Sequence, residues 1–474
     1  MRNPKEKLLN ENEMAPTKID DFLRLGRYSL LICIACELVV LMQAGNLLFM
    51  VFGGAPPKLI ACQNDSSVID LPEGILCEMY HNGTCDPRLE YSFNSVNVEF
   101  NYICGDSSSI KDSTSIQMIG YVIGTLIFGQ ISDHFGRKLP MLITVLLTGI
   151  FGFASSFAHN LYTFTALRFL AIFFNTGHVV IVVVFMCETL PMRHRMWLNF
   201  LINWSPNILL VTCFAFILGD WRKLSILINL LAIPICILLF FSEESVYWLV
   251  RKGKIEEALE TIEKMGKIDG KTMDLDGAKK IFEEERQQAQ KTASRRYFFH
   301  HLFYSWTLVS YSITMFASYM CVGIFNYGIM FNLETLSGSL YNNMITVASL
   351  RMILNLSSAA ADFKLKWLGR LTAHYIFGGY ATCAVLGIIV IQYFGLELTY
   401  SLLVRWLVIS ASSMASQIFL TNQVTCSEIY PTPIRNIAYA MTQLSGSTGS
   451  ILGAQLFKLS ELSIQLPYLL TLQT

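Results

Sequence analysis

The sequence predicts an all-α integral membrane protein, and composition is the first reason. Of its 474 residues, 53% are hydrophobic and only 15% are charged, whereas soluble globular domains carry about 25% charged residues. Its mean hydropathy is +0.46. Apolar segments of about 20 residues, the length that crosses a bilayer as a helix, recur along almost the whole chain. We therefore expect a lipid bilayer to surround most of the molecule.

The first half of the chain contains six such segments. Residues 1–27 precede them and lack the apolar core and cleavage site of a secretory signal, so the first segment should remain as a signal anchor. Residues 28–241 would form an N-terminal six-helix half. Its predicted spans are Tyr28–Phe52, Ile116–Ser132, Leu139–Ala158, Tyr162–Cys187, Leu198–Leu218 and Leu224–Phe241.

A charged segment, residues 242–302, separates these spans from a second group. Within it, 256–265 and 277–290 have the pattern of amphipathic helices, which predicts a linker. Residues 303–474 would form the C-terminal half, with spans Phe303–Phe331, Tyr341–Ala361, Leu371–Phe394, Tyr400–Thr421 and Ile434–Phe457. From Leu462 onward about 13 residues remain, roughly 20 Å of helix, so we expect an incomplete twelfth helix. Two explanations of the short last helix stay open: a truncated isoform or gene model, and a true paralogue that has lost part of this helix.

Loop charge predicts the orientation, because Lys and Arg near span ends are retained in the cytoplasm. Positive residues precede the first span and occupy alternate loops, which places the N-terminus and the linker in the cytoplasm. The loop at residues 53–115 is then extracellular. Two sequons there predict glycosylation at Asn64 and Asn82. Four cysteines predict two disulfides, and three pairings remain open: Cys62, Cys77, Cys85 and Cys104.

The loop after the second predicted span carries a strong motif, Gly129-Gln130-Ile131-Ser132-Asp133-His134-Phe135-Gly136-Arg137-Lys138. It resembles in full the signature of the major facilitator superfamily. This resemblance implies two six-helix halves, small residues where helices approach closely, and a cytoplasmic cluster formed by the Asp and Arg. A degenerate copy, Asp362 with Gly369-Arg370, lies at the equivalent place of the second half, as an internal repeat would leave.

Further motifs are similar to those of the organic cation, anion and zwitterion transporters. They are Arg168-Phe169-Leu170, Asp220-Trp221-Arg222, Glu244-Ser245 with Trp248-Leu249, and Ser427-Glu428-Ile429-Tyr430-Pro431-Thr432 with Ile434-Arg435-Asn436. Val246 and Tyr247 depart from the family pattern, and the first extracellular loop is short. The resemblance therefore indicates a divergent member.

Ionisable groups at membrane depth are functional candidates, because they are costly to bury. Glu37 would bind a cation or proton, or merely pair or snorkel. His178 would couple protons, or stay neutral and hydrogen bonded. Arg351 lies mid-span at a position where similar cation transporters carry an acidic residue, so a basic residue there favours anionic substrates. At the position of Ser447, similar proteins carry an acidic residue when they transport cations and a basic one when they transport anions. This chain is neutral there. Arg405 would bind substrate or hold helices together. The charge preference stays open.

The seventh span contributes two aromatic candidates, Phe316 and Tyr319, which would stack on substrate or serve only as packing. A second set lies at predicted cytoplasmic helix ends, where salt bridges would close that side in one state and break in the other, or simply set the topology. This gating set comprises Gly129, Asp133, Gly136, Arg137, Lys138, Glu188, Arg195, Glu244, Asp362, Arg370, Glu428 and Arg435.

The sequence thus predicts transport of small organic ions across the plasma membrane by alternating access. No P-loop, metal-ligand spacing or nucleophile with its base occurs, so we expect no enzyme activity, metal or cofactor. The formal net charge is zero, without an isolated basic run, so nucleic acid is not an expected partner. Oligomeric state stays open. The alternatives are a sugar-type facilitator and a receptor-like paralogue that transports nothing.

Overall fold

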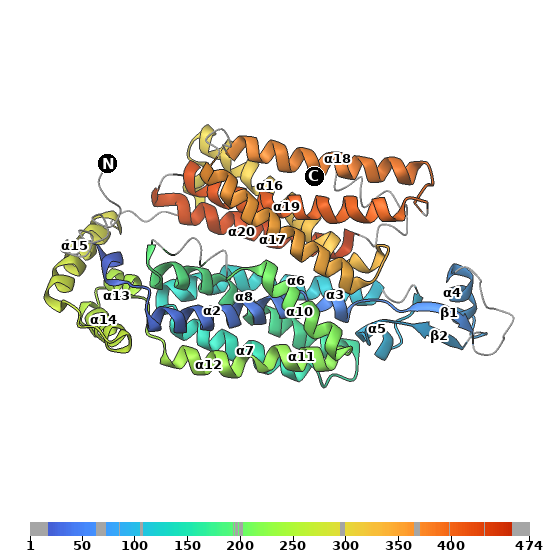
Figure 1. Cartoon of the computed structure of the whole chain (residues 1–474), viewed down its shortest axis with the longest axis horizontal. Helices are drawn as coiled ribbons and strands as arrows, with labels where there is room; N and C mark the ends of the chain where they lie inside the picture. Colours follow the sequence, from blue (N-terminus) through green and yellow to red (C-terminus); the bar gives the residue numbers. More distant parts are fainter. Residues whose placement is uncertain are drawn as a thin grey trace.

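Two layers of long helices lie side by side in the computed structural model (Figure 1). The structure describes residues 18–62, 73–84, 86–104, 108–192, 194, 198, 202–293, 299–364, 370–397, 399–430 and 432–456. The N-terminal layer contains α2 (Arg27–Leu47), α3 (Phe49–Gly53), α6 (Ser108–Phe135), α7 (Lys138–Ser155), α8 (Leu161–Thr189), α10 (Trp204–Leu218), α11 (Trp221–Leu230) and α12 (Ala232–Phe241). The C-terminal layer contains α16 (Trp306–Met330), α17 (Leu340–Lys364), α18 (Arg370–Tyr393), α19 (Ser401–Ile429) and α20 (Thr432–Leu456).

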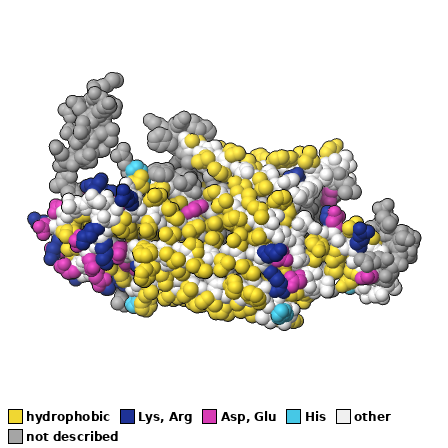
Figure 2. All heavy atoms as spheres, turned by 60° about the horizontal axis from the view of Figure 1, so that its bottom comes forward, with side chains coloured by type: hydrophobic (Ala, Val, Ile, Leu, Met, Phe, Trp, Pro, Cys, Tyr) yellow, Lys and Arg dark blue, Asp and Glu magenta, His cyan; other side chains and the backbone are white. Residues whose placement is uncertain are grey.

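Eight helices of the described chain are long and apolar enough to cross a membrane, and α10 is a shorter apolar helix. Large apolar side chains point outward from helices of both layers, including Ile217 of α10, Phe240 of α12 and Ile353 of α17. Figure 2 shows the result as a broad hydrophobic band, with charged side chains gathered mainly at one end of the molecule. Such a band suits a lipid environment. The predicted incomplete twelfth helix falls in 457–474, outside the described residues.

The second span begins earlier than its hydropathy predicted. The structure starts α6 at Ser108, so the predicted boundary at Ile116 was wrong. Polar residues of this first stretch have hydrogen-bond partners within the fold. Ser113 bonds Thr165 of α8 at 2.7 Å, and Thr114 donates to the backbone of its own helix. A polar helix end that is satisfied by neighbouring helices is invisible to a hydropathy window.

Two of the spans are interrupted helices. The break between α2 and α3 falls at Leu48, where the Asn46 carbonyl accepts a 2.6 Å bond from Arg168 Nη2. The break between α11 and α12 falls at Leu231. Pro234 follows it, and proline removes the backbone donor that would continue the helical ladder. Both interruptions lie inside the N-terminal layer, and at the first of them the Arg168 side chain satisfies a freed carbonyl.

The linker is helical, as its amphipathic pattern predicted. It contains α13 (Val246–Lys252), α14 (Ile255–Asp269) and α15 (Leu275–Ala293), followed by η3 (Phe299–Phe303). The short helix η1 (Ile19–Phe22) packs on it, with the Phe22 and Phe282 ring centroids 6.1 Å apart. We call this part of the molecule the linker end.

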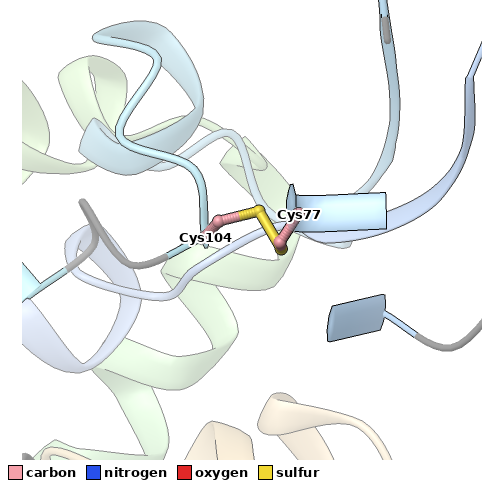
Figure 3. Close-up of a disulfide and its surroundings, with 2 residues drawn as sticks. All are labelled: Cys77 and Cys104. Carbon is pink, nitrogen blue, oxygen red and sulfur yellow. A yellow bond between two sulfur atoms is a disulfide. The ribbon is translucent and has the colours of Figure 1, made fainter. Parts of the chain in front are cut away.

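The opposite end of the N-terminal layer carries the first long loop (Figure 1). It folds into β1 (Lys58–Cys62), α4 (Glu73–His81), β2 (Pro87–Glu90) and α5 (Val96–Glu99), with β1 and β2 antiparallel. A disulfide joins Cys77 of α4 to Cys104, just before α6 (Figure 3). Cys62 is also disulfide-bonded, while Cys85 and Asn64 lie outside the described residues. We call this the disulfide end.

Glycines set the closest helix approach within each layer. A Cβ at Gly124 would lie 2.6 Å from the Phe173 carbonyl oxygen, so α6 and α8 can only meet this closely without a side chain there. In the C-terminal layer a Cβ at Gly449 would lie 2.5 Å from the Met320 oxygen. Between the layers, α6 packs on α20 and α10 on α17.

Candidate functional site

The linker end of the N-terminal layer holds a charge cluster centred on Arg137. Its side chain is 7% exposed and pairs with Asp133 at 2.7 Å and with Glu188 at 3.3 Å. Arg137 Nη1 also donates to Ser132 Oγ at 2.7 Å. Since Asp133 belongs to α6 and Glu188 to α8, one guanidinium ties two helices to the start of α7.

Glu244 joins this cluster from the linker side. Its carboxylate accepts bonds from the backbone nitrogens of Arg137 at 2.7 Å and Lys138 at 3.2 Å. Gly136 makes room for it: its φ is +104°, and a Cβ would lie 2.4 Å from Glu244 Oε2. Trp248 Nε1 donates to the Asp133 carbonyl at 3.1 Å. These hydrogen bonds therefore hold the motif loop against the start of the linker.

The rest of the predicted gating set is only partly described. The side chains of Arg195, Asp362, Arg370 and Arg435 lie outside the described residues, and Glu428 is exposed. A Cβ at Gly129 would meet only Val180, at 3.9 Å, so the close approach of α6 and α8 occurs at Gly124 instead. Every described partner of Arg137 comes from the N-terminal layer or the segment leading into the linker.

A second group, which we call the central cluster, surrounds Arg351 near the middle of α17. Arg351 Nη2 donates to Asn326 Oδ1 and to Ser412 Oγ, both at 2.8 Å, and Nη1 approaches Met330 Sδ at 3.5 Å. These partners come from α16 and α19. All of them are uncharged, and no ion pair to Arg351 occurs among the described residues.

The burial of Arg351 makes this arrangement costly. The residue is 9% exposed, and its Nε is buried without a hydrogen-bond partner. A buried charge that lacks a counter-charge costs several kcal/mol relative to water, and neutral hydrogen bonds offset only part of that. The site would therefore gain from an anionic group.

Tyr121 of α6 brings the other layer into the central cluster. Its hydroxyl lies within hydrogen-bond reach of Ser447 on α20 and of Tyr327 on α16, and Tyr327 lies close to Arg351. The structure thus unites two predicted residues, Arg351 and Ser447. Tyr121 was not predicted as a site residue, because a tyrosine in a span that also contains Gln117 and Gln130 gives no local signal of a site.

The other predicted charged residues lie apart from one another. Glu37 of α2 contacts Asn207 of α10, and its Oε2 is buried without a hydrogen-bond partner. Arg405 lies in the second turn of α19, beside Gly338 at the disulfide end. His178 is completely buried in α8, and neither ring nitrogen has a partner among the described residues.

The two predicted aromatics pack within the C-terminal layer. Tyr319 is fully buried and meets Phe419 edge to face, with ring centroids 5.5 Å apart. The Phe316 carbonyl accepts a 2.6 Å bond from Ser445 of α20. Packing alone explains the ring contact of Tyr319, whereas the contact of Phe316 is made by its backbone carbonyl.

Arg168 is a buried arginine whose role the sequence pointed to only through a motif. Its guanidinium is fully buried, donates to Asn46 Oδ1 at 2.8 Å and lies 4.3 Å from the centre of the Phe49 ring. Asn46 in turn bonds Asn229 at 3.2 Å. This network connects α2, α8 and α11 and holds the interrupted first span in place.

Contacts at the disulfide end join the two layers. Gln455 of α20 donates to Asp112 at 2.9 Å and to Ser115 at 2.8 Å, both on α6. Lys111 Nζ donates to Asn332 at 3.0 Å. The Tyr341 hydroxyl donates to the Ser92 carbonyl at 3.2 Å. These bonds close the layers against each other at this end.

Comparison with known proteins defines the family. Residues 81–472 match the model of the sugar (and other) transporter family. This chain belongs to that family. An inward-open structure of the E. coli xylose transporter XylE aligns with a TM-score of 0.64 at 15% identity, covering 94% of each chain. The predicted all-α fold of the major facilitator type is confirmed.

The curated relatives agree with the predicted subfamily. An uncharacterized protein of Caenorhabditis elegans is 26% identical over 95% of this chain and 90% of its own length. Solute carrier family 22 member 16 of Xenopus laevis is 24% identical, covering 80% of this chain and 66% of its own length. Organic cation/carnitine transporter 2 of Mus musculus is 25% identical, with 83% and 70% covered. The chain is a multi-pass membrane transporter, not an enzyme.

Proposed function

We propose that this chain carries small organic ions across the plasma membrane by alternating access, and that Arg351 receives the negative group of the substrate. One observation carries the proposal: Arg351 is buried, has only neutral hydrogen-bond partners, and lies beside the layer interface through Tyr327 and Tyr121. Guanidinium and phenol donors in a dry site are suited to a carboxylate or a similar anion.

The packing of the two layers supports the proposed cycle. In this structure they are joined at the disulfide end by Gln455, Lys111 and Tyr341. Opening that end would expose the central cluster to the solution on the disulfide-end side, because Tyr121 and Arg351 belong to different layers. The two layers would then move largely as rigid bodies about the central cluster.

A zwitterion is the second candidate, and Glu37 supports it. This acid lies in the N-terminal layer with one carboxylate oxygen buried and unpartnered. It would attract a cationic group while Arg351 holds an anionic one. One relative, organic cation/carnitine transporter 2, has a name that pairs these two chemistries.

The proposed orientation follows the charge of the loops: linker end cytoplasmic, disulfide end extracellular. Asn82 offers a test of this side assignment, since it is exposed just after α4 and its sequon is available to glycosylation. Removal of the glycan from intact cells by an added glycosidase would establish the side. Asn82→Gln should shift the electrophoretic mobility of the cell-surface protein.

The test of transport is uptake into cells that express the chain at the surface. The panel contains an aromatic carboxylate, tetraethylammonium, carnitine and glucose, each with the wild type and Arg351→Ala. We expect uptake of the carboxylate or carnitine that Arg351→Ala abolishes. Glucose uptake unaffected by Arg351→Ala would support a sugar-type facilitator, and surface protein without any uptake would support a receptor-like role; either would overturn the proposal.

A further inference from the structure

Glu334 occupies an unusual place for an acid. It lies in η4 (Leu333–Thr335), the short turn between α16 and α17 at the disulfide end. A small cavity there is lined by Met50, Gly54, Ile110, Lys111, Thr114, Phe331, Glu334 and Ala454. These residues come from both layers, so the cavity lies in the interface that closes the disulfide end.

Apart from a hydrogen bond from its own backbone, the Glu334 carboxyl has little to stabilise its charge in this state. Its Oε2 is buried without a hydrogen-bond partner. The nearest cation, Lys111, directs its ammonium to Asn332 Oδ1 at 3.0 Å, and no ion pair between Lys111 and Glu334 occurs among the described residues. Apolar side chains of Met50, Ile110 and Phe331 complete the wall. A carboxylate in such a place is disfavoured relative to the neutral acid.

We propose that Glu334 is a proton-binding latch between the two layers: the neutral acid allows the disulfide end to close, and loss of its proton favours opening. The inference rests on the proposed alternating access. Opening would bring water to the cavity, and a solvated glutamate is ionised at neutral pH. The ligand of this site is the proton itself.

The electrostatics of the neighbourhood agree with this role. Burial raises the pKa of Glu334 from 4.5 to about 7, opposed first by a hydrogen bond from its own backbone and then by the charge of Lys111. Asp112, next to Lys111 on α6, is bonded to Gln455, and α17 presents the Tyr341 hydroxyl, which is bonded to Ser92. The lining residues contributed by α3 and α20 carry no ionisable side chain.

The sign of the pH effect follows from these pKa values. Below about 4.5 both states are protonated and the closed state carries no penalty. Between about 4.5 and about 7 the open state loses its proton first, so opening becomes more favourable as pH rises. Above about 7 both states are ionised and the effect levels off. The closed-to-open ratio should change by up to roughly three-hundredfold across this window of about 2.5 pH units.

The experiment measures the opening itself, without substrate. Cysteine labels replace two exposed tyrosines at the disulfide end, Tyr162 on α8 and Tyr393 on α18, in a background with Cys213→Ser and Cys383→Ser. The full-length protein is reconstituted in lipid nanodiscs, and the spin-label distance distribution is recorded from pH 4.5 to 8. We expect the long-distance population to grow as pH rises to about 7.

Three variants make the test specific. Glu334→Gln should remain closed at every pH. Lys111→Met should move the transition to higher pH, because Lys111 favours the ionised acid. Glu90→Gln, at an exposed position of β2, should behave as the wild type. An unchanged pH response in Glu334→Gln, or no response in the wild type, would overturn the latch. Uptake measured at fixed pH would still report on transport independently.

Discussion

The linker-end charge cluster and the central cluster both contain a buried arginine, yet their charges are balanced in opposite ways. Arg137 meets two carboxylates, Asp133 and Glu188. Arg351 meets only an amide, a hydroxyl and a thioether. A paired buried charge holds helices together, whereas a buried charge without a counter-ion is available to a ligand. The contrast separates residues that maintain the structure from those that would bind substrate.

The largest expected effect is on stability, at Arg137. Arg137→Met leaves Glu188, whose side chain is 12% exposed, without its partner. The free energy of unfolding should fall by about 3 kcal/mol, as when one member of a buried pair is removed. Denaturant unfolding of the purified protein in mixed micelles measures this. A loss below about 0.5 kcal/mol would mean that the pair is solvated in the membrane protein.

The matching substitution at Arg351 should affect uptake strongly and stability little. Arg351→Met removes a charge that has no counter-ion, so the unfolding free energy should change by less than about 1 kcal/mol. Uptake of the anionic substrate should fall at least tenfold, which corresponds to about 1.4 kcal/mol. Uptake by proteoliposomes containing equal amounts of protein measures it. Equal stability losses in the two arginine variants would remove the contrast between the clusters.

Asp133 should affect turnover more than stability. It is 75% exposed and contributes one salt bridge to Arg137. Asp133→Asn should lower the transport rate about threefold to tenfold while surface expression remains normal, because a charge-assisted bond in a two-state element is weakened. Glu257→Gln, which removes an exposed pair with Lys254, is the control and should transport normally. A transport rate of Asp133→Asn equal to that of the wild type would contradict the gating role of Asp133.

The smallest expected effect is at Tyr121. Tyr121→Phe removes a hydroxyl that reaches Ser447 and Tyr327 across the layers. Loss of one neutral hydrogen bond, about 1 kcal/mol, should raise the KM for uptake several-fold with little change in maximal rate. Tyr375→Phe, on the exposed face of α18, is the matched control. If both tyrosine variants have the wild-type KM, Tyr121 takes no part in substrate binding.

Much of the candidate site was visible in the sequence, but as separate residues. Arg351 stood out because an ionisable group in an apolar segment is rare. Ser447 and Arg405 were singled out by resemblance, yet the structure brings only Ser447 to Arg351, while Arg405 lies toward the disulfide end. Side-chain partners such as Asn326 and Ser412 come from other helices, so no local pattern reports them.

The glycine positions also show that the sequence does not report contacts between helices. The motif drew attention to Gly129, whereas Gly124 makes the close contact with α8. Both are glycines on the same helix, and only the position of Phe173 distinguishes them. Glu334 was likewise missed, because a glutamate in a turn is ordinarily exposed and the burial of its Oε2 depends on the opposite layer.

The sequence by itself determined the membrane-spanning class, the helical linker and the family. Each is encoded locally: hydropathy over a single segment decides whether it enters lipid, amphipathic spacing decides the linker helices, and the motif from Gly129 to Lys138 is contiguous. The tertiary structure alone decided which charges are paired and which are not. That depends on which helices meet, because burial and counter-ions are properties of neighbours distant in the chain.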